Sequence, residues 1–120
     1  MAKILICDDA EFMRKTIRET LEAAGHEVAG EADDVDAGVE QYKKLRPDLV
    51  TMDMIMEHSG VDAIKQIKEF DPKAKIIVVS VFQEQEGDIV SAIRAGALGM
   101  VSKPIKREVL LEEIDRVLKL

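Results

Sequence analysis

The sequence predicts an α/β domain in which one five-stranded parallel sheet carries helices on both faces. Two observations lead to this fold class. Apolar runs of strand length recur along the chain, and a segment with helical spacing of apolar residues follows each of them. Strict alternation of this kind is typical of parallel sheets, because a helix must cross one face of the sheet to join each strand to the next.

The first half of the chain predicts three strands separated by two helices. The expected strands cover residues 3–7, 27–32 and 49–52. From Ala10 onward apolar residues recur at helical spacing, and Gly25 is typical of a helix end. Asp33 and Asp34 are candidates to cap the second helix, because an aspartate oxygen accepts hydrogen bonds from the free N–H groups at a helix start, and Pro47 is expected to end that helix.

The second half predicts two further strands, over residues 75–79 and 98–101, and three further helices. The apolar residues that mark these helices are Val61, Ile64 and Ile67, then Ile89, Val90 and Ile93, and finally Leu110, Leu111, Ile114, Val117 and Leu118. Pro72 and Gly96 are expected to follow the ends of the first two. Five strands joined by right-handed crossovers fit the doubly wound, flavodoxin-like strand order 2-1-3-4-5.

The length of 120 residues predicts one domain over 1–120. With 17 Lys and Arg against 24 Asp and Glu, the net charge of −7 argues against a nucleic-acid-binding module and suits cations or basic protein surfaces. Cys7, the one cysteine, excludes a disulfide framework and lies in an apolar run, so we expect it in the core. No apolar run is long enough to span a membrane and no secretion signal is present, so we expect a cytoplasmic protein without membrane insertion.

Chemically active side chains follow four of the predicted strands. Asp8 and Asp9 follow the first strand and Asp53 the third, while Ser80 and Lys103 follow the fourth and fifth. Parallel strands end at the same edge of a sheet, and ligands bind there, beside the point where the strand order reverses. Three carboxylates against one ammonium repel one another unless a cation joins them. Because Mg²⁺ prefers carboxylates, carbonyls and water as ligands, the sequence predicts a magnesium site at the three aspartates, with an open position for a phosphate.

Four segments carry a resemblance to a known family. ILICDDAEFMR, DLVTMD, IIVVS and SKP, in this order and spacing, resemble the receiver domain of two-component response regulators, over Lys3 to about Leu118. The AEFMR segment and the chain end after the fifth helix are most similar to stand-alone, chemotaxis-type (CheY-like) regulators. The resemblance implies a phosphorylation-activated signalling switch, not an enzyme. Such a switch takes a phosphoryl group from a histidine kinase and passes the signal to a protein target.

The resemblance also implies a role for each residue at the strand ends. Asp53 would be the phosphoacceptor, a carboxylate nucleophile that attacks the phosphorus of a phosphohistidine. Asp9 would bind Mg²⁺ directly, Asp8 through a water molecule, and the backbone carbonyl of Ile55 would be a further protein ligand. The metal would neutralise the phosphoryl oxygens and orient them for in-line transfer.

Two other residues of the set would hold the phosphoryl group and report its arrival. Lys103 would pair with the acyl phosphate, and Ser80 would donate a hydrogen bond to a phosphoryl oxygen. A cis peptide bond often precedes the proline after this lysine in the family, here Pro104. The output surface would then be the fourth helix, fifth strand and fifth helix, around Ile89, Met100 and Lys106.

The chain departs from the family pattern at three places. Glu57 stands where the family usually has proline, and Gly60 comes one residue early, so the loop after the acceptor is shorter. Met100 replaces the usual aromatic switch residue, so a relay that depends on an aromatic rotamer is not expected here. Ile55 and Phe82 are apolar where many relatives have polar residues. We expect them to shield the acyl phosphate from water, so that dephosphorylation is slow and a separate phosphatase ends the signal.

Other functions remain open from the residues alone. A flavin-binding electron carrier of the same fold class would need aromatic residues around the flavin, and the chain has no Trp and one Tyr. A phosphohydrolase with an aspartate nucleophile commonly has a second aspartate two residues later, where this chain has Ile55. A receiver that is never phosphorylated would not be expected to keep Asp9, Asp53, Ser80 and Lys103. A receiver domain cut from a longer regulator remains an alternative to a stand-alone protein.

Overall fold

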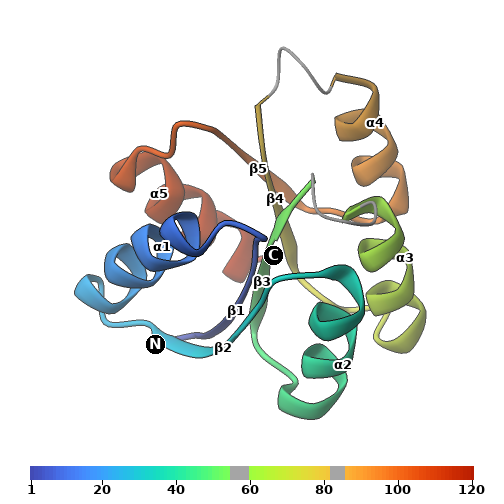
Figure 1. The fold of residues 1–120 in the computed structure, drawn as a ribbon, viewed down its shortest axis with the longest axis horizontal. Helices are drawn as coiled ribbons and strands as arrows, with labels where there is room; N and C mark the ends of the chain where they lie inside the picture. The colour runs from blue at the N-terminus through green and yellow to red at the C-terminus, as the bar shows by residue number, and fades with distance from the viewer. Residues whose placement is uncertain (55–59, 82–85) are drawn as a thin grey trace.

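The computed structural model describes residues 1–54, 60–81 and 86–120, without the side chains of 86–88. Strands and helices alternate along these residues (Figure 1). The strands are β1 (Lys3–Cys7), β2 (Glu27–Ala32), β3 (Leu49–Asp53), β4 (Ile76–Ser80) and β5 (Gly99–Ser102). The helices are α1 (Glu11–Ala23), α2 (Val35–Leu45), α3 (Gly60–Phe70), α4 (Glu86–Ala95) and α5 (Arg107–Leu118).

The strands form one parallel sheet in the order β2-β1-β3-β4-β5, which confirms the predicted topology. The central strand, β3, pairs with β1 on one side and with β4 on the other. Every residue of β3 and β4 is buried, as expected for strands that helices cover on both faces. The last residue of β3, Asp53, therefore lies in the middle of the carboxyl edge of the sheet.

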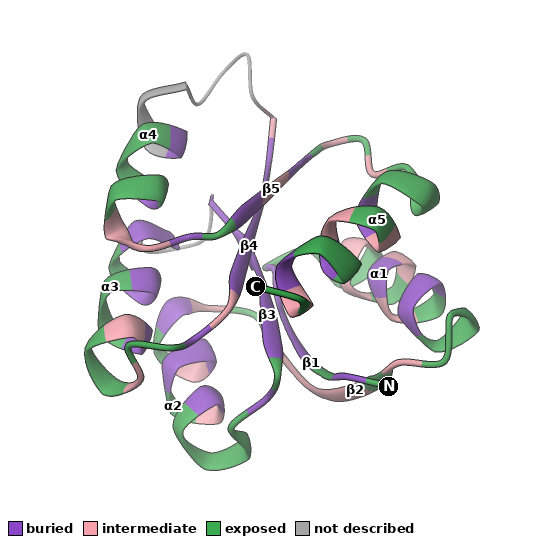
Figure 2. Cartoon of the chain, turned by 180° about the vertical axis from the view of Figure 1, so that it is seen from behind, coloured by how far each residue is buried: buried purple, intermediate pink, exposed green. Residues whose placement is uncertain are grey.

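Two apolar cores lie on opposite faces of the sheet, because successive side chains of a strand point to opposite sides. α1 and α5 cover one face, where Leu21 and Leu110 pack in the same cluster as Ile6 of β1. α2, α3 and α4 cover the other face, where Ile64 packs in the same cluster as Cys7. In Figure 2 the strands are largely buried and the helices are buried along one side, as this layering requires. The burial of Cys7 confirms its predicted place in the core.

The helix ends follow local chemistry. α1 is followed by Gly25, whose φ of 87° lies in the left-handed region that glycine adopts without strain. Asp34, not Asp33, caps α2, because its side chain accepts a hydrogen bond of 2.7 Å from the N–H of Ala37. Arg46 ends α2 in the left-handed region, directly before Pro47. None of the helices in the described part of the chain is long enough and apolar enough to cross a bilayer.

Two strands and the buried side of one helix differ from the sequence prediction. β4 and β5 each begin and end one residue later than predicted, because the ladder continues through the pair formed by Ser80 and Ser102. α4 is confirmed as a helix, but among its predicted apolar markers only Ile89 is buried. Val90 and Ile93 are 46% and 50% exposed, since each lies one residue, or about 100°, beyond the stripe that Ile89 and Ala92 turn toward the core.

Replacing Asp34 with alanine should lower the free energy of unfolding by about 1 kcal/mol, the usual cost of losing an N-cap side chain. The reason is that the N–H of Ala37 loses its acceptor. Urea unfolding followed by circular dichroism measures the difference. Asp33→Ala is the matched control, because this exposed aspartate is not the cap, and equal losses in the two variants would contradict the assignment.

Candidate functional site

Four strand ends bring chemically active side chains to one edge of the sheet, as predicted. Asp8 follows β1 directly, Asp53 and Ser80 are the last residues of β3 and β4, and Lys103 follows β5. Three of these, Asp8, Asp53 and Ser80, are buried, whereas Asp9 is exposed to solvent. The parallel ladder therefore assembles the site from residues that are far apart in the sequence.

The Lys103 ammonium lies between two buried carboxylates. Its Nζ donates a hydrogen bond of 3.2 Å to Oδ1 of Asp53 and lies 3.3 Å from Oδ2 of Asp8. The backbone holds the lysine in place, because the N–H of Lys103 donates to the carbonyl of Ser80 at 2.8 Å. The Lys103–Pro104 peptide bond is cis, as the resemblance implies.

The surroundings of Lys103 keep it charged. Burial by itself lowers the pKa of the ammonium, but the charges of Asp53 and Asp8, together with the hydrogen bond to Asp53, outweigh this effect and raise the pKa. Cys7, which precedes Asp8 in the sequence, also has a raised pKa, but for a thiol this favours the neutral form. Burial, and next the charge of Asp8, raise the pKa of its thiol to about 12, so Cys7 is neither a thiolate ligand nor a nucleophile at neutral pH.

Three carboxylates in this site fit a divalent cation. Asp8, Asp9 and Asp53 each offer one oxygen, and these oxygens lie within 4.8 Å of one another. Oδ1 of Asp8 accepts the N–H of Ala10 at 2.9 Å, whereas the buried Oδ2 has the Lys103 ammonium at 3.3 Å as an ion-pair partner but accepts no hydrogen bond from the residues that the structure describes. A buried carboxylate oxygen in this situation is costly unless a cation compensates it, and Lys103 supplies one charge for three carboxylates. Oxygen donors of this type suit Mg²⁺.

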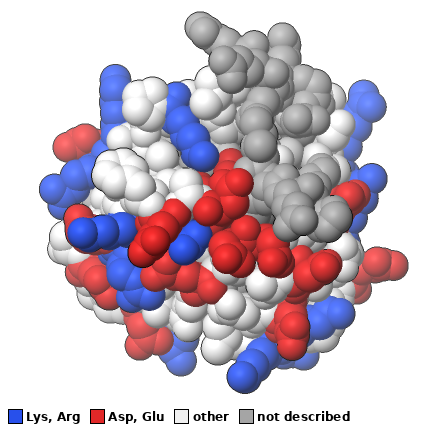
Figure 3. All heavy atoms as spheres, in the orientation of Figure 1, with Lys and Arg blue, Asp and Glu red and all other residues white. Residues whose placement is uncertain are grey.

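The net charge of the protein adds to this preference for a cation. Figure 3 shows Asp and Glu side chains across the middle of the face, with Lys and Arg side chains among them. The net charge of −7 attracts cations to the molecule as a whole. The predicted ligand Ile55 lies outside the described residues, as do Glu57 and Phe82, so their expected roles stay predictions.

Two residues of the site were missed as such by the sequence analysis. Gly60, noted there only as a loop variant, packs against the end of β3, because a Cβ at this position would lie 2.6 Å from the carbonyl oxygen of Asp53. Arg14 reaches back from α1, and its Nη1 donates a hydrogen bond of 2.7 Å to the carbonyl of Asp8. The spacing of Arg14, one turn into the helix that follows the acidic pair, is a signal that could have indicated this contact.

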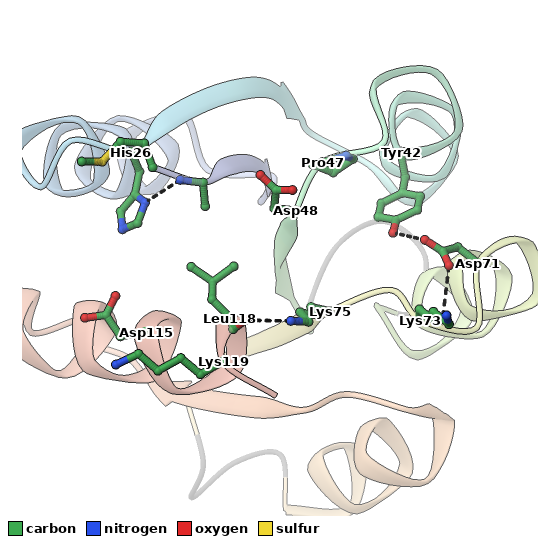
Figure 4. Close-up of a pocket in the computed structure, with 12 residues that line it drawn as sticks. His26, Tyr42, Pro47, Asp48, Asp71, Lys73, Lys75, Asp115, Leu118 and Lys119 are labelled. Carbon is green, nitrogen blue, oxygen red and sulfur yellow. Dashed lines mark hydrogen bonds between the residues drawn. The ribbon is translucent and has the colours of Figure 1, made fainter.

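A hollow of about 520 Å³ lies elsewhere on the molecule and does not include the acidic residues (Figure 4). Several of its polar groups already serve the fold: the hydroxyl of Tyr42 donates to Asp71 at 2.8 Å, and Nζ of Lys75 donates to the carbonyl of Leu118 at 2.8 Å. His26 likewise accepts a hydrogen bond from the N–H of Ala2 at 3.2 Å. Size alone therefore does not identify the site, and the carboxyl edge of the sheet is the stronger candidate.

Comparison with known proteins agrees with this geometry. Residues 4–115 match the family described as the response regulator receiver domain. The chain is 46% identical over 118 residues to the chemotaxis protein CheY of Thermotoga maritima, with 98% of each chain covered. It is 44% identical over 117 residues to the chemotaxis protein CheY of Bacillus subtilis, with 97% of each chain covered. Among solved structures, the response regulator domain of Thermotoga maritima CheB superposes with a TM-score of 0.89 at 30% identity, over 98% of this chain and 96% of that one.

Replacing Lys103 with methionine should flatten the alkaline loss of stability. The raised pKa means that the folded protein keeps the Lys103 proton longer than the unfolded chain does. Stability from this ion pair is therefore complete below about pH 10, near the pKa of an unfolded lysine, and is lost as the pH rises through the folded value. Urea unfolding measured from pH 8 upward should show that the difference in free energy of unfolding between wild type and variant becomes smaller as the pH rises.

Lys106→Met is the matched control for this experiment, because Lys106 is exposed and makes no ion pair with the buried aspartates. The difference in free energy of unfolding between Lys106→Met and wild type should stay constant over the same pH range. If the difference for Lys103→Met also stays constant, the two carboxylates do not raise the pKa of Lys103 and the prediction is wrong.

Proposed function

The chain belongs to the response regulator receiver domain family, and we propose that this phosphorylation-activated signalling switch accepts its phosphoryl group on Asp53. One observation supports this assignment above the others. Asp53 ends the central strand, is buried beside the Asp8 carboxylate, and accepts a hydrogen bond from the Lys103 ammonium. The same oxygen-rich position would receive a phosphoryl group, with the lysine as a counter-charge already in place.

The reaction that we propose is a direct in-line transfer. A carboxylate oxygen of Asp53 forms a bond to phosphorus while the bond from phosphorus to the imidazole nitrogen of the donor breaks, and the nitrogen keeps the electron pair. Asp8, Asp9 and Asp53 would hold Mg²⁺, which when bound neutralises and orients the phosphoryl oxygens. Lys103 then pairs with the acyl phosphate, and the hydroxyl of Ser80 donates to a phosphoryl oxygen.

The output face that we propose consists of α4, β5 and α5, and Figure 2 shows β5 between the two helices. Lys103 follows β5 and Ser80 ends β4, so a phosphoryl group that binds both acts first on this side of the sheet. β5 is also tied to α5, because Glu113 accepts the N–H of Met100 at 2.9 Å. The exposed apolar side chains of α4, Val90 and Ile93, supply contact area for a protein target, whereas Ile89 is buried and does not.

The partners follow from this mechanism. We propose a histidine kinase as phosphodonor, a protein target at the output face, and a separate phosphatase, with no direct binding of nucleic acid. The two relatives above are named chemotaxis proteins, which supports a role in chemotaxis. The chain would act in the cytoplasm as one receiver domain over residues 1–120, and as a signalling protein that assists its own phosphoryl transfer.

Asp53→Asn should abolish labelling by acetyl phosphate or by a phosphohistidine donor in the presence of Mg²⁺, because the amide is not a nucleophile of comparable strength. Phosphate-affinity electrophoresis and mass spectrometry of the tryptic peptides measure the label. Asp48→Asn is the matched control, since Asp48 lies at the other end of β3 and accepts the backbone N–H of Lys3.

A label that persists on the same peptide in Asp53→Asn would contradict the assignment. Continuous release of phosphate from the donor by wild type, without a stable label, would instead indicate the phosphohydrolase that the sequence left open.

Hydrogen exchange should report the output face. With beryllofluoride and Mg²⁺ as a mimic of the phosphorylated state, amides of α4, β5 and α5 should change most, because Ser80 and Lys103 link that side to the phosphoryl position. The Asp53→Asn variant should show no change under the same conditions. Changes confined to α1 and α2 would place the output surface on the other side of the molecule.

A further inference from the structure

The turn that carries the acidic pair is held from three directions. The N–H of Asp8 donates to the carbonyl of Ala32 in β2 at 3.0 Å. Oδ1 of Asp8 accepts the N–H of Ala10 at 2.9 Å, which closes the turn on itself. Nη1 of Arg14 donates to the carbonyl of Asp8 at 2.7 Å. This carbonyl belongs to the peptide unit that joins Asp8 to Asp9, so the guanidinium fixes the orientation of that unit.

A carboxylate on the edge strand β2 holds Arg14 in this position. Oε1 of Glu31 accepts from Nε of Arg14 at 3.1 Å, and Oε2 accepts from Nε of Arg18 at 2.7 Å. The side chain of Arg14 is only 17% exposed and that of Glu31 30%, so the pair is partly shielded from water. The backbone of Glu31 is fixed as well, because its carbonyl accepts a hydrogen bond of 2.7 Å from the Gln41 amide.

We propose that Arg14 is a positioning residue for the cation site, and that Glu31 acts through it. The planar guanidinium makes two contacts that diverge, one with the Asp8 carbonyl and one with Glu31, and thus ties the acidic turn to β2. The proposal rests on the proposed function only in taking Asp8, Asp9 and Asp53 as the ligand set. It assigns a new role to two residues that contact neither the cation nor the phosphoryl group.

Two effects make this contact important for cation affinity. Fixing the peptide between Asp8 and Asp9 keeps the two carboxylates in one relative orientation, so less ordering is needed when a cation binds. Glu31 also engages the positive charge of Arg14 and directs it at a carbonyl. An Arg14 without that partner is free to pair with the neighbouring carboxylates and to compete with the cation.

Titration of the ¹⁵N-labelled protein with MgCl₂ at constant ionic strength tests the proposal through amide chemical shifts. Arg14→Ala should raise the Kd for Mg²⁺ about tenfold, the size of effect that loss of an outer-shell partner typically has. Arg14→Lys should give an intermediate Kd, because one ammonium cannot make both contacts in the same geometry. Arg18→Gln is the matched control, since Arg18 shares Glu31 but does not touch Asp8, and its Kd should stay within about twofold of wild type.

The combination of Arg14→Ala with Glu31→Gln separates positioning from a general loss of structure. If Glu31 acts through Arg14, the double variant should bind Mg²⁺ no more weakly than Arg14→Ala alone, although its stability to urea is lower. An unchanged Kd in Arg14→Ala, whatever its stability, overturns the proposal. So do losses of affinity in the two single variants that add fully in the double variant.

Failure of the proposed function gives a different result. If the wild type shows no Mg²⁺-dependent shifts near Asp8, Asp9 and Asp53, or if Asp9→Ala binds as wild type does, the cation site itself is wrong. If wild type binds, Asp9→Ala does not, and Arg14→Ala binds normally, the site stands and only the role of Arg14 is refuted.

Discussion

The ion pair between Lys103 and two buried carboxylates is the interaction on which the site depends. Asp8 and Asp53 lose most of their hydration when the sheet forms, and the ammonium at 3.2–3.3 Å offsets part of that cost. One positive charge does not balance three aspartates, so the folded protein keeps an excess of negative charge at this edge. The Lys103 ammonium thus offsets part of the cost of burying the carboxylates, and we propose that the remaining negative charge attracts a cation and, with it, a phosphoryl group.

The surrounding fold connects this edge to both sides of the sheet. On one side Arg14 and Glu31 join the acidic turn to α1 and β2. On the other side the hydrogen bond from the N–H of Lys103 to Ser80 joins the ends of β5 and β4, and Glu113 joins β5 to α5. We propose that the first set of contacts positions the ligands for a cation, and that the second links the phosphoryl position to an output face.

Sequence patterns predicted every strand and helix of the described residues, but they predicted less well which side chains are buried and which residues are in contact. The spacing of apolar residues and the positions of Gly and Pro were enough to predict the five strands and five helices of the described residues, including the end of α1 before Gly25. They did not separate Asp33 from Asp34 as the cap, because both are aspartates in the same local setting and only the backbone geometry selects one. They also did not show that Val90 and Ile93 lie on the outside of α4, since an apolar residue in a helix is compatible with a core or with an interface.

The sequence by itself determined the fold class and the residue types at the strand ends, because hydrophobic periodicity and turn residues are local properties of the chain. It also determined that Asp8, Asp53, Ser80 and Lys103 would meet, since parallel strands place their carboxyl ends at one edge. Only the tertiary structure decided that Oδ2 of Asp8 is buried without a hydrogen bond among the described residues and that Arg14 and Glu31 hold the acidic turn. These facts depend on distances between α1, β2 and the β1 end, and such distances follow from how the elements pack, which no local pattern encodes.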